Sequence, residues 1–142
     1  MPVTFDKLIQ RFQTADKNTR LEALLDYSRR LPELPARFQV DRDREAHRIA
    51  ECMTPVFLWI ERENGVLRLY ADVPRESPTV RGFVALLVSA LDGQPGEVAA
   101  GIPADLIHLL RLDETLGMMR MQGLSAIVER VKRAAAKVPP AA

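Results

Sequence analysis

The sequence is poor in the residues that build covalent and metal-bound frameworks. It has one cysteine, Cys52, and two histidines, His47 and His108. One cysteine excludes a disulfide within the chain, and it excludes a zinc or iron–sulfur site made of several cysteines from one copy. We therefore predict no metal and no cofactor. The lone thiol is then either a core residue or a reactive group.

The sequence also lacks an excess of charge and a long apolar run. Its formal net charge is +1, which gives neither a broad basic field for nucleic acid nor the acidic excess typical of disorder. The longest apolar candidate, residues 80–91, is interrupted by Arg81, Gly82 and Ser89, so it does not reach the roughly 18 to 20 apolar residues of a membrane span. The start, MPVTFDKLIQRF, lacks the basic and then apolar pattern of a secretory signal. We expect a protein that binds neither nucleic acid nor membranes. We expect it in the reducing cytoplasm, where a free thiol persists.

The apolar pattern that is present predicts helices around a β-hairpin. Residues 5–12, 18–30, 78–91 and 118–137 have helical periodicity, with shorter pieces at 95–100 and 103–110. Ser77 is the expected N-cap of the helix at 78–91. Apolar residues at 56–60 and 66–70 flank Asn64-Gly65, a hairpin turn, and the charged stretch 36–48 is predicted to be irregular.

These elements define one α+β domain. The 142 residues are enough for a single core, which we place at residues 1–138, with 139–142 as a frayed tail. The expected sheet is small and antiparallel, with two to three strands, and helices flank it because they precede and follow the strands rather than alternate with them.

Cys52 lies where the charged stretch meets the first strand. Glu51 precedes it and Thr54-Pro55 follows. A cysteine at such a junction is placed where a loop presents it, whereas most free cysteines are buried and inert. The residues alone leave both readings open.

Four segments in order resemble the SufE-like sulfur-acceptor family. HRIAECMTPVFLWIE resembles its active-cysteine segment, Asn-x-Val-x-Gly-Cys-x-Ser-x-Val-Trp, and LLDYSRRLPELP resembles its early helix with Leu-Pro-x-Leu-Pro. ESPTVRGFVALLVSALDGQPGEV resembles Asp-Ser-x-x-x-Val-Lys-Gly-x-x-Ala-Leu-Leu, and RMQGLSAIVERVK resembles the last helix with Arg-x-x-Gly-Leu-x-Ala-Met. The similarity extends over nearly the whole chain.

The resemblance implies a SufE/IscU-like fold and a sulfur-carrying thiol. In the family, a pyridoxal-phosphate cysteine desulfurase of the SufS type holds sulfur as a persulfide, and the acceptor takes it for iron–sulfur cluster assembly. Cys52 would be the acceptor, with the desulfurase as its partner and an iron–sulfur scaffold as a recipient. In the family the unloaded thiol rests in an apolar pocket and swings out toward the partner; Met53, Phe57 and residues 80–87 are candidates for such a pocket.

The resemblance also suggests which residues lie around the thiol. The family's arginine at the position of Arg120 lies close to the cysteine loop, where its charge would favour the thiolate; the alternative is an ordinary surface arginine. Arg81 and Gly82 match the family pattern, and Gly82 and Gly123 would let their helices approach the loop. The alternative for both glycines is a plain helix–helix contact.

The chain departs from the family pattern at four positions around the thiol. Glu51 replaces the usual glycine, and a carboxylate beside a thiol disfavours the thiolate unless a cation offsets it. His47 replaces asparagine and is either a proton shuttle or a solvated loop residue. Thr54 keeps a hydroxyl and Phe57 keeps an aromatic ring, so these two changes are mild.

Three functional hypotheses follow. The first is the sulfur carrier, acting on Cys52 and stimulating the desulfurase. The second is an interaction module that binds and modulates a desulfurase or related partner without carrying sulfur, which Glu51 favours. The third is the same fold with an inert structural cysteine. The sequence leaves open which desulfurase and recipient are involved and whether the protein is a monomer or a homodimer.

Overall fold

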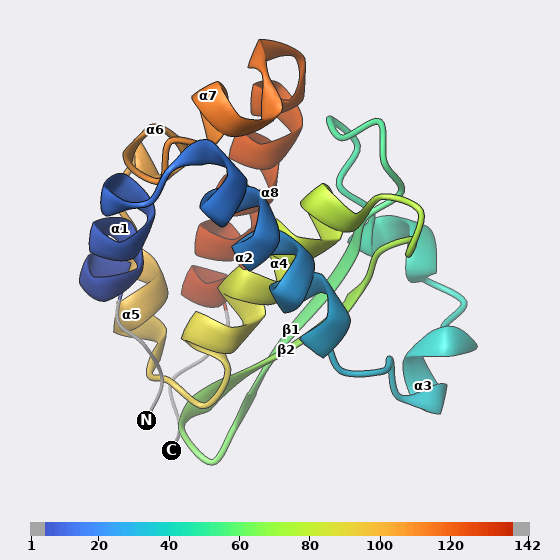
Figure 1. Cartoon of the computed structure of the whole chain (residues 1–142). Coiled ribbons are helices and arrows are strands. Elements are labelled where there is room, and N and C mark those ends of the chain that lie inside the picture. Colours follow the sequence, from blue (N-terminus) through green and yellow to red (C-terminus); the bar gives the residue numbers. More distant parts are fainter. Residues whose placement is uncertain (1–4, 138–142) are drawn as a thin grey trace.

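A computed structural model describes residues 5–137 (Figure 1). The helices are α1 (Phe5–Thr14), α2 (Lys17–Arg30), α3 (Ala36–Gln39), α4 (Pro78–Leu91), α5 (Gly96–Ala100), α6 (Leu106–Leu109), α7 (Leu112–Leu116) and α8 (Met121–Lys137). The 3₁₀ turns are η1 (Arg44–His47) and η2 (Met118–Arg120), and the strands are β1 (Phe57–Glu63) and β2 (Val66–Asp72). The predicted α+β class is confirmed. The tail predicted at 139–142 lies outside the described residues.

The two strands form one antiparallel hairpin. Phe57 pairs with Asp72 at one end and Glu63 with Val66 at the other. The turn residues Asn64 and Gly65 both have positive φ, 53° and 82°, as a two-residue hairpin turn with the right twist requires. Within residues 5–137 the sheet has these two strands, the lower end of the predicted range.

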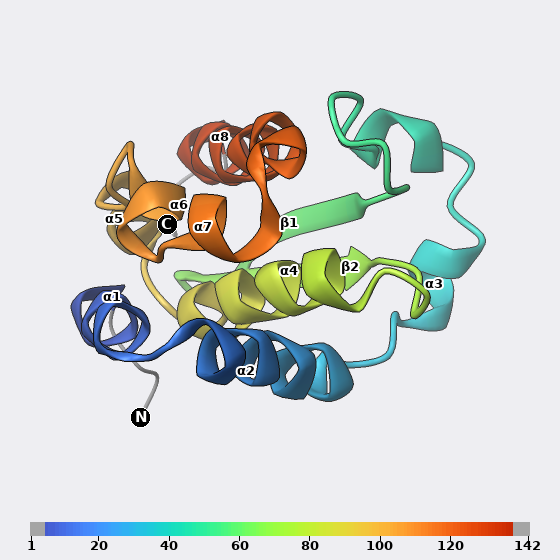
Figure 2. The ribbon, with the colours of Figure 1, turned by 45° about the horizontal axis from the view of Figure 1, so that its top comes forward.

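Helix α4 is the centre of the molecule. It lies between α2 and the hairpin, with α8 beside β1 (Figure 2). Eleven of its 14 residues are buried, which confirms the burial that its nearly all-apolar sequence predicts. Ser77 occupies the N-cap position, as the sequence predicted, although its hydroxyl makes no capping hydrogen bond there.

Gly82 permits the close approach of α4 to α2. A Cβ at this position would lie 2.1 Å from the carbonyl oxygen of Leu24, well inside any tolerable contact. The expectation that Gly82 serves the cysteine loop was wrong, since the closest atoms belong to α2. The plain helix–helix contact is the correct reading.

The hairpin separates the main core from a smaller aromatic cluster. Leu58 points into the main core, whereas Phe57 and Trp59 pack with Phe38 on the other side, as the alternation of side chains along a strand dictates. The indole of Trp59 donates to Asp41 Oδ2 at 2.9 Å. These contacts order α3 and η1 within the stretch that was predicted to be irregular.

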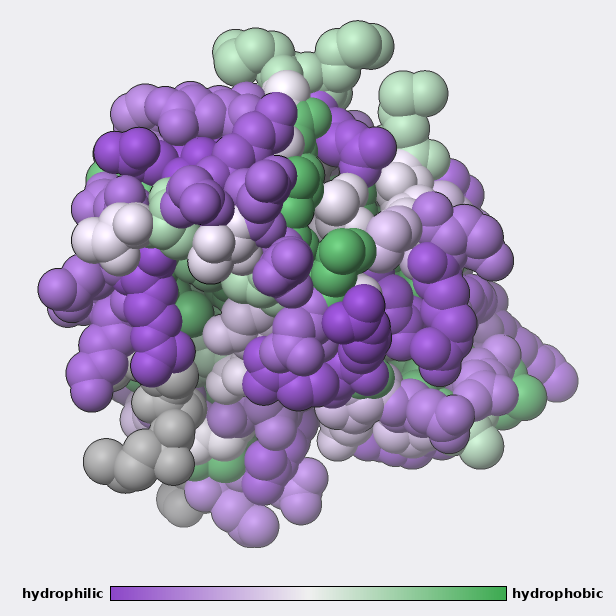
Figure 3. Space-filling view, viewed as in Figure 1, coloured by the Kyte–Doolittle hydropathy of each residue, from purple (hydrophilic) through white to green (hydrophobic). Residues whose placement is uncertain are grey.

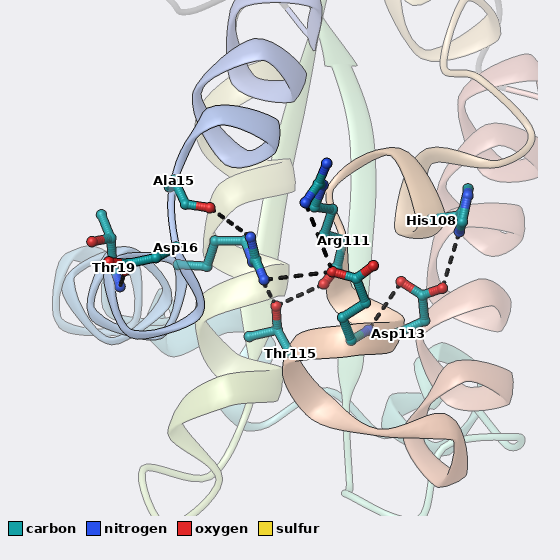
Figure 4. Close-up of polar contacts among 9 residues, drawn as sticks. Ala15, Asp16, Thr19, His108, Arg111, Asp113 and Thr115 are labelled. Carbon is teal, nitrogen blue, oxygen red and sulfur yellow. Dashed lines mark hydrogen bonds and ion pairs between the residues drawn. The ribbon is translucent and has the colours of Figure 1, made fainter.

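The N-terminal helices are tied to α7 by a buried arginine. Arg20 is 5% exposed; its Nε donates to Thr115 Oγ1 at 2.8 Å and its Nη1 to the carbonyl of Ala15 at 2.6 Å. Figure 4 shows this group and the Arg111 carbonyl, which accepts from the Thr115 hydroxyl. The sequence did not predict α7, a five-residue helix whose first residue, Leu112, is fully buried.

None of the helices within residues 5–137 has the length and apolar character needed to cross a membrane.

Candidate functional site

Cys52 lies in a closed loop that leads into β1. The backbone N–H of Ile49 donates to the carbonyl of Val56 at 2.9 Å, and a β-bridge joins Arg48 to Phe57. Inside this closure the N–H of Cys52 donates to the carbonyl of Ile49 at 3.2 Å. The loop stands at one end of the hairpin, at the upper right of Figure 1, where the sequence placed it.

The thiol is the buried member of an otherwise exposed run. Cys52 is 7% exposed, while Glu51 and Met53 on either side are exposed and Met53 is 98% accessible. The side chain of Cys52 joins the main core. The thiol therefore faces the core while the residues next to it face solvent.

Gly123 of α8 forms the surface against which Cys52 packs. A Cβ at position 123 would lie 3.1 Å from Cys52 Sγ and 3.3 Å from its Cα. Both distances are tighter than ordinary contacts, so only glycine lets α8 and the loop meet at their present separation. The approach that the sequence suggested for Gly123 is present, whereas the one suggested for Gly82 is not.

Burial dominates the electrostatics of the thiol. It raises the pKa of Cys52, while hydrogen bonds from the backbone and hydroxyl of Thr54 and the charges of Arg120 and Arg48 lower it. The net direction is upward, because a thiolate is costly in apolar surroundings. The sequence pointed to Glu51 as the chief obstacle to the thiolate, but the largest cause is desolvation.

Arg120 is held beside the loop by α4. Its Nη1 donates to the hydroxyl of Thr79 at 2.7 Å. Thr79 is in the first turn of α4, so this bond joins η2 to the start of the central helix. The sequence pointed to Arg120 but not to its partner Thr79, nor to Arg48 as a second cation that acts on the thiol; both depend on tertiary structure.

Helix α8 also holds the base of the loop. The guanidinium of Arg130 donates to the carbonyls of Ala46 and Arg48. Gly123 and Arg130 are seven residues apart, two helical turns, and so lie on the same face of α8. One helix face therefore contacts the loop at its cysteine and at the start of its closure.

His47 and Phe57 do not adjoin the thiol through any contact that the structure gives. The ring of His47 stacks on Trp59 with centroids 5.2 Å apart, and its Nδ1 lies 3.1 Å from the carbonyl oxygen of Leu58. Phe57 packs in the aromatic cluster with Arg44 over its ring. The prediction that Phe57 lines the thiol pocket was wrong because the first residue of β1 points to the opposite face of the hairpin.

Arg81 is buried, and its side chain binds backbone carbonyls of neighbouring elements. It is 9% exposed, and its Nε and Nη1 donate to the carbonyls of Ser28 and Val73, at 2.9 and 2.5 Å. Burial lowers its pKa. These bonds fix α4 to α2 and to the residue that follows β2, and they do not reach the cysteine loop.

Exposed methionines border the loop. The prediction that Met53 lines a pocket around the thiol was wrong, because its side chain is exposed to solvent. Met118 and Met119 of η2 are also exposed, at 76% and 97%. Pale green hydrophobic side chains protrude from the top edge of a mostly purple surface in Figure 3, the edge where the loop and η2 lie in Figure 1.

Residues 5–137 contain no group of three or more histidine, cysteine or acidic side chains placed to hold a metal. His108 is exposed and pairs with Asp113, with 3.0 Å between Nδ1 and Oδ2 (Figure 4). This pair lies on α6 and α7. The chemistry offered at the loop is that of a single thiol with nearby cations.

The fold and the cysteine loop define a SufE-type domain. The family model for SufE, the Fe-S metabolism associated domain, matches residues 6–135, and the chain belongs to this family. It is 32% identical over 117 residues to the sulfur acceptor protein CsdE of Escherichia coli K12, covering 81% of this chain and 76% of that protein. It is 29% identical over 134 residues to an uncharacterised SufE-like protein of Mycobacterium tuberculosis H37Rv, covering 94% and 92%.

A solved structure has the same fold. The solution structure of a hypothetical protein from Thermus thermophilus superposes with a TM-score of 0.81 at 30% identity, covering 96% of both chains. The family resemblance that the sequence motifs indicated is thus confirmed.

Proposed function

We propose that this chain accepts persulfide sulfur on Cys52 from a SufS-type cysteine desulfurase in the cytoplasm and passes it to iron–sulfur cluster assembly. The observation that carries the proposal is the placement of the chain's single thiol. Cys52 lies in a closed loop between exposed neighbours, and Thr54, Arg48 and Arg120 lower the pKa of its thiol. The sulfur-acceptor name of the E. coli relative supports the same reading.

The transfer is a thiol exchange. The Cys52 thiolate attacks the terminal sulfur of the donor persulfide; a new S–S bond forms at Cys52, and the donor's S–S bond breaks with its cysteine leaving as a thiolate. The proton lost from Cys52 balances the proton that the donor thiolate takes up. No external oxidant or reductant is needed, because one disulfide-type bond replaces another.

The closed position of Cys52 suits a carrier that must not react with other partners. With a raised pKa and 7% exposure, the free thiol is a poor nucleophile toward solutes. Opening of the loop against a partner would restore access and lower the desolvation cost. Reaction would then be confined to the docked state.

Intact-mass measurement tests the proposal directly. Incubation with an active desulfurase and free cysteine is expected to add the mass of one sulfur atom or more to the wild-type chain and none to a Cys52→Ser variant. A thiol reductant should remove the added mass. Desulfurase turnover with no gain of mass on the wild-type chain contradicts the proposal.

The burial of the thiol also favours a second candidate, a module that binds a desulfurase without carrying sulfur. In that case a Cys52→Ala variant would stimulate the desulfurase as well as the wild type does. A sulfur carrier would lose its stimulation with the same change, so the two functions give opposite results in one assay.

A further inference from the structure

A cavity of about 360 Å³ lies between η1, β1 and α8. Part of its lining is apolar and comes from two alanines and from Leu58 and Ile60, which point to the same face of β1 because side chains alternate along a strand. The rest of the lining is basic and consists of His47, Arg130 and Arg133. None of the described residues that line the cavity is acidic. Its volume is within the range of cavities that hold small molecules.

The two arginines of this cavity carry positive charges that no carboxylate of residues 5–137 pairs with. The guanidinium of Arg130 donates to two backbone carbonyls at the base of the cysteine loop, and these acceptors are uncharged. Arg133 is exposed, and within residues 5–137 it forms no hydrogen bond or ion pair. His47 differs from them, because its Nε2 lies 3.8 Å from Asp41 Oδ2. The unmatched charge at the cavity is therefore that of the two arginines.

The spacing of these arginines suits a phosphate group. Arg130 and Arg133 are three residues apart on α8, so their side chains are neighbours on the helix surface, where like charges repel each other. An anion between them would replace this repulsion by charge-assisted hydrogen bonds, and the planar guanidinium pairs especially well with phosphate oxygens. A phosphate monoester carries close to two negative charges at neutral pH, which matches two arginines, whereas a carboxylate carries one.

We propose that this cavity binds a small phosphate monoester with an apolar body. Arg130 and Arg133 hold the phosphate, and the apolar body packs on Leu58 and Ile60. The apolar lining favours such a ligand over inorganic phosphate, because burial of an apolar group against it adds free energy of binding that a bare ion does not gain. The inference goes beyond the proposed function, since this site requires no sulfur on Cys52.

Phenyl phosphate is the probe for this site, titrated into the full-length chain labelled with ¹⁵N and followed by NMR. The backbone amide signals of Ala46, Leu58 and Ala134 should shift most, and the shifts should saturate. Two further probes each lack one feature of the ligand: inorganic phosphate has no apolar body, and benzoate has a single charge. Each is expected to bind with a Kd about tenfold higher than that of phenyl phosphate, or weaker.

Arg133→Gln tests the phosphate contact. It should raise the Kd for phenyl phosphate about tenfold, because charge-assisted hydrogen bonds to the phosphate are lost. The matched control is Arg29→Gln, which removes the same charge from an exposed position on α2 and should leave the Kd unchanged. Since Arg133 holds no partner within residues 5–137, its substitution should not lower the urea midpoint, so unfolding does not account for a loss of affinity.

Three results would overturn the proposal. The first is an equal Kd for wild type and Arg133→Gln, which would remove the arginines from the site. The second is binding of inorganic phosphate as tight as that of phenyl phosphate, which would exclude the apolar contact. The third is a set of shifts that do not saturate, or that spread over arginines across the surface and fall equally in Arg29→Gln, as general attraction of an anion would produce.

Discussion

At the scale of single residues, Gly123 decides how deeply Cys52 is buried. Replacing it with alanine places a methyl group 3.1 Å from Cys52 Sγ, and the loop must yield by a few tenths of an ångström. The packing of the closed loop should weaken by about 1–2 kcal/mol, which corresponds to roughly 5- to 30-fold more open loop. The rate at which a thiol reagent modifies Cys52 should rise by that factor.

Gly101→Ala is the control for this substitution. A Cβ at position 101 would meet its nearest neighbours at 3.5 Å and beyond, an ordinary contact, and φ there is −82°. Its thiol should react at the wild-type rate. An unchanged rate in Gly123→Ala as well would show that the loop does not depend on this contact.

The charges around the thiol predict a pH dependence. Because burial raises the pKa of Cys52, the pH–rate profile of alkylation should have its midpoint above that of the same thiol in the unfolded chain. Arg120→Gln removes a charge that lowers this pKa, so the midpoint should move further upward and alkylation at neutral pH should slow. Arg42→Gln, an exposed arginine of the charged stretch, should leave the profile unchanged; a downward move in Arg120→Gln would refute the assigned role.

At the scale of elements, α8 is the support of the cysteine loop. Arg130→Gln shortens the side chain that donates to the carbonyls of Ala46 and Arg48. The loss of these charged hydrogen bonds should reduce the free energy of unfolding by about 1–2 kcal/mol. Hydrogen exchange of the amides of Ile49 and Cys52 should accelerate more than that of amides in the middle of α4.

Arg133→Gln provides the comparison on the same helix, since Arg133 is exposed. It should change neither stability nor exchange by a measurable amount. Equal acceleration of exchange in α4 and in the loop of Arg130→Gln would mean that the arginine stabilises the whole domain and not the loop.

The sequence predicted helices and strands better than it predicted which residues lie next to one another in the fold. The hairpin follows from Asn64-Gly65 between two apolar runs, because the turn and the alternation are local properties. Helices α3 and α7 were missed because burial of Phe38 and Leu112 against distant elements forms them. The helical periodicity of the sequence does not determine which residue each helical glycine faces: Gly82 faces Leu24, and Gly123 faces Cys52.

At the scale of the whole molecule, the buried Arg20 joins the beginning of the chain to the segment that leads to the thiol site. It reaches Thr115 and the Ala15 carbonyl, and α7 runs directly into η2 and α8 through Gly117, whose φ is 86°. Few other polar groups within residues 5–137 are as buried: the buried polar residues are Arg20, Ser28, Arg81 and Thr115.

Arg20→Ala should therefore destabilise the fold through loss of a buried polar connection. The Ala15 carbonyl loses its donor and the Thr115 hydroxyl loses Nε, and unmet buried groups cost about 1–3 kcal/mol. We expect the urea midpoint to fall by the equivalent of about 2 kcal/mol at an unchanged slope. Arg29→Ala changes an exposed residue on the same helix, and its free energy of unfolding should stay within about 0.5 kcal/mol of the wild-type value. Equal urea midpoints for the two variants would show that Arg20 adds no net stability, because the cost of its desolvation cancels its hydrogen bonds.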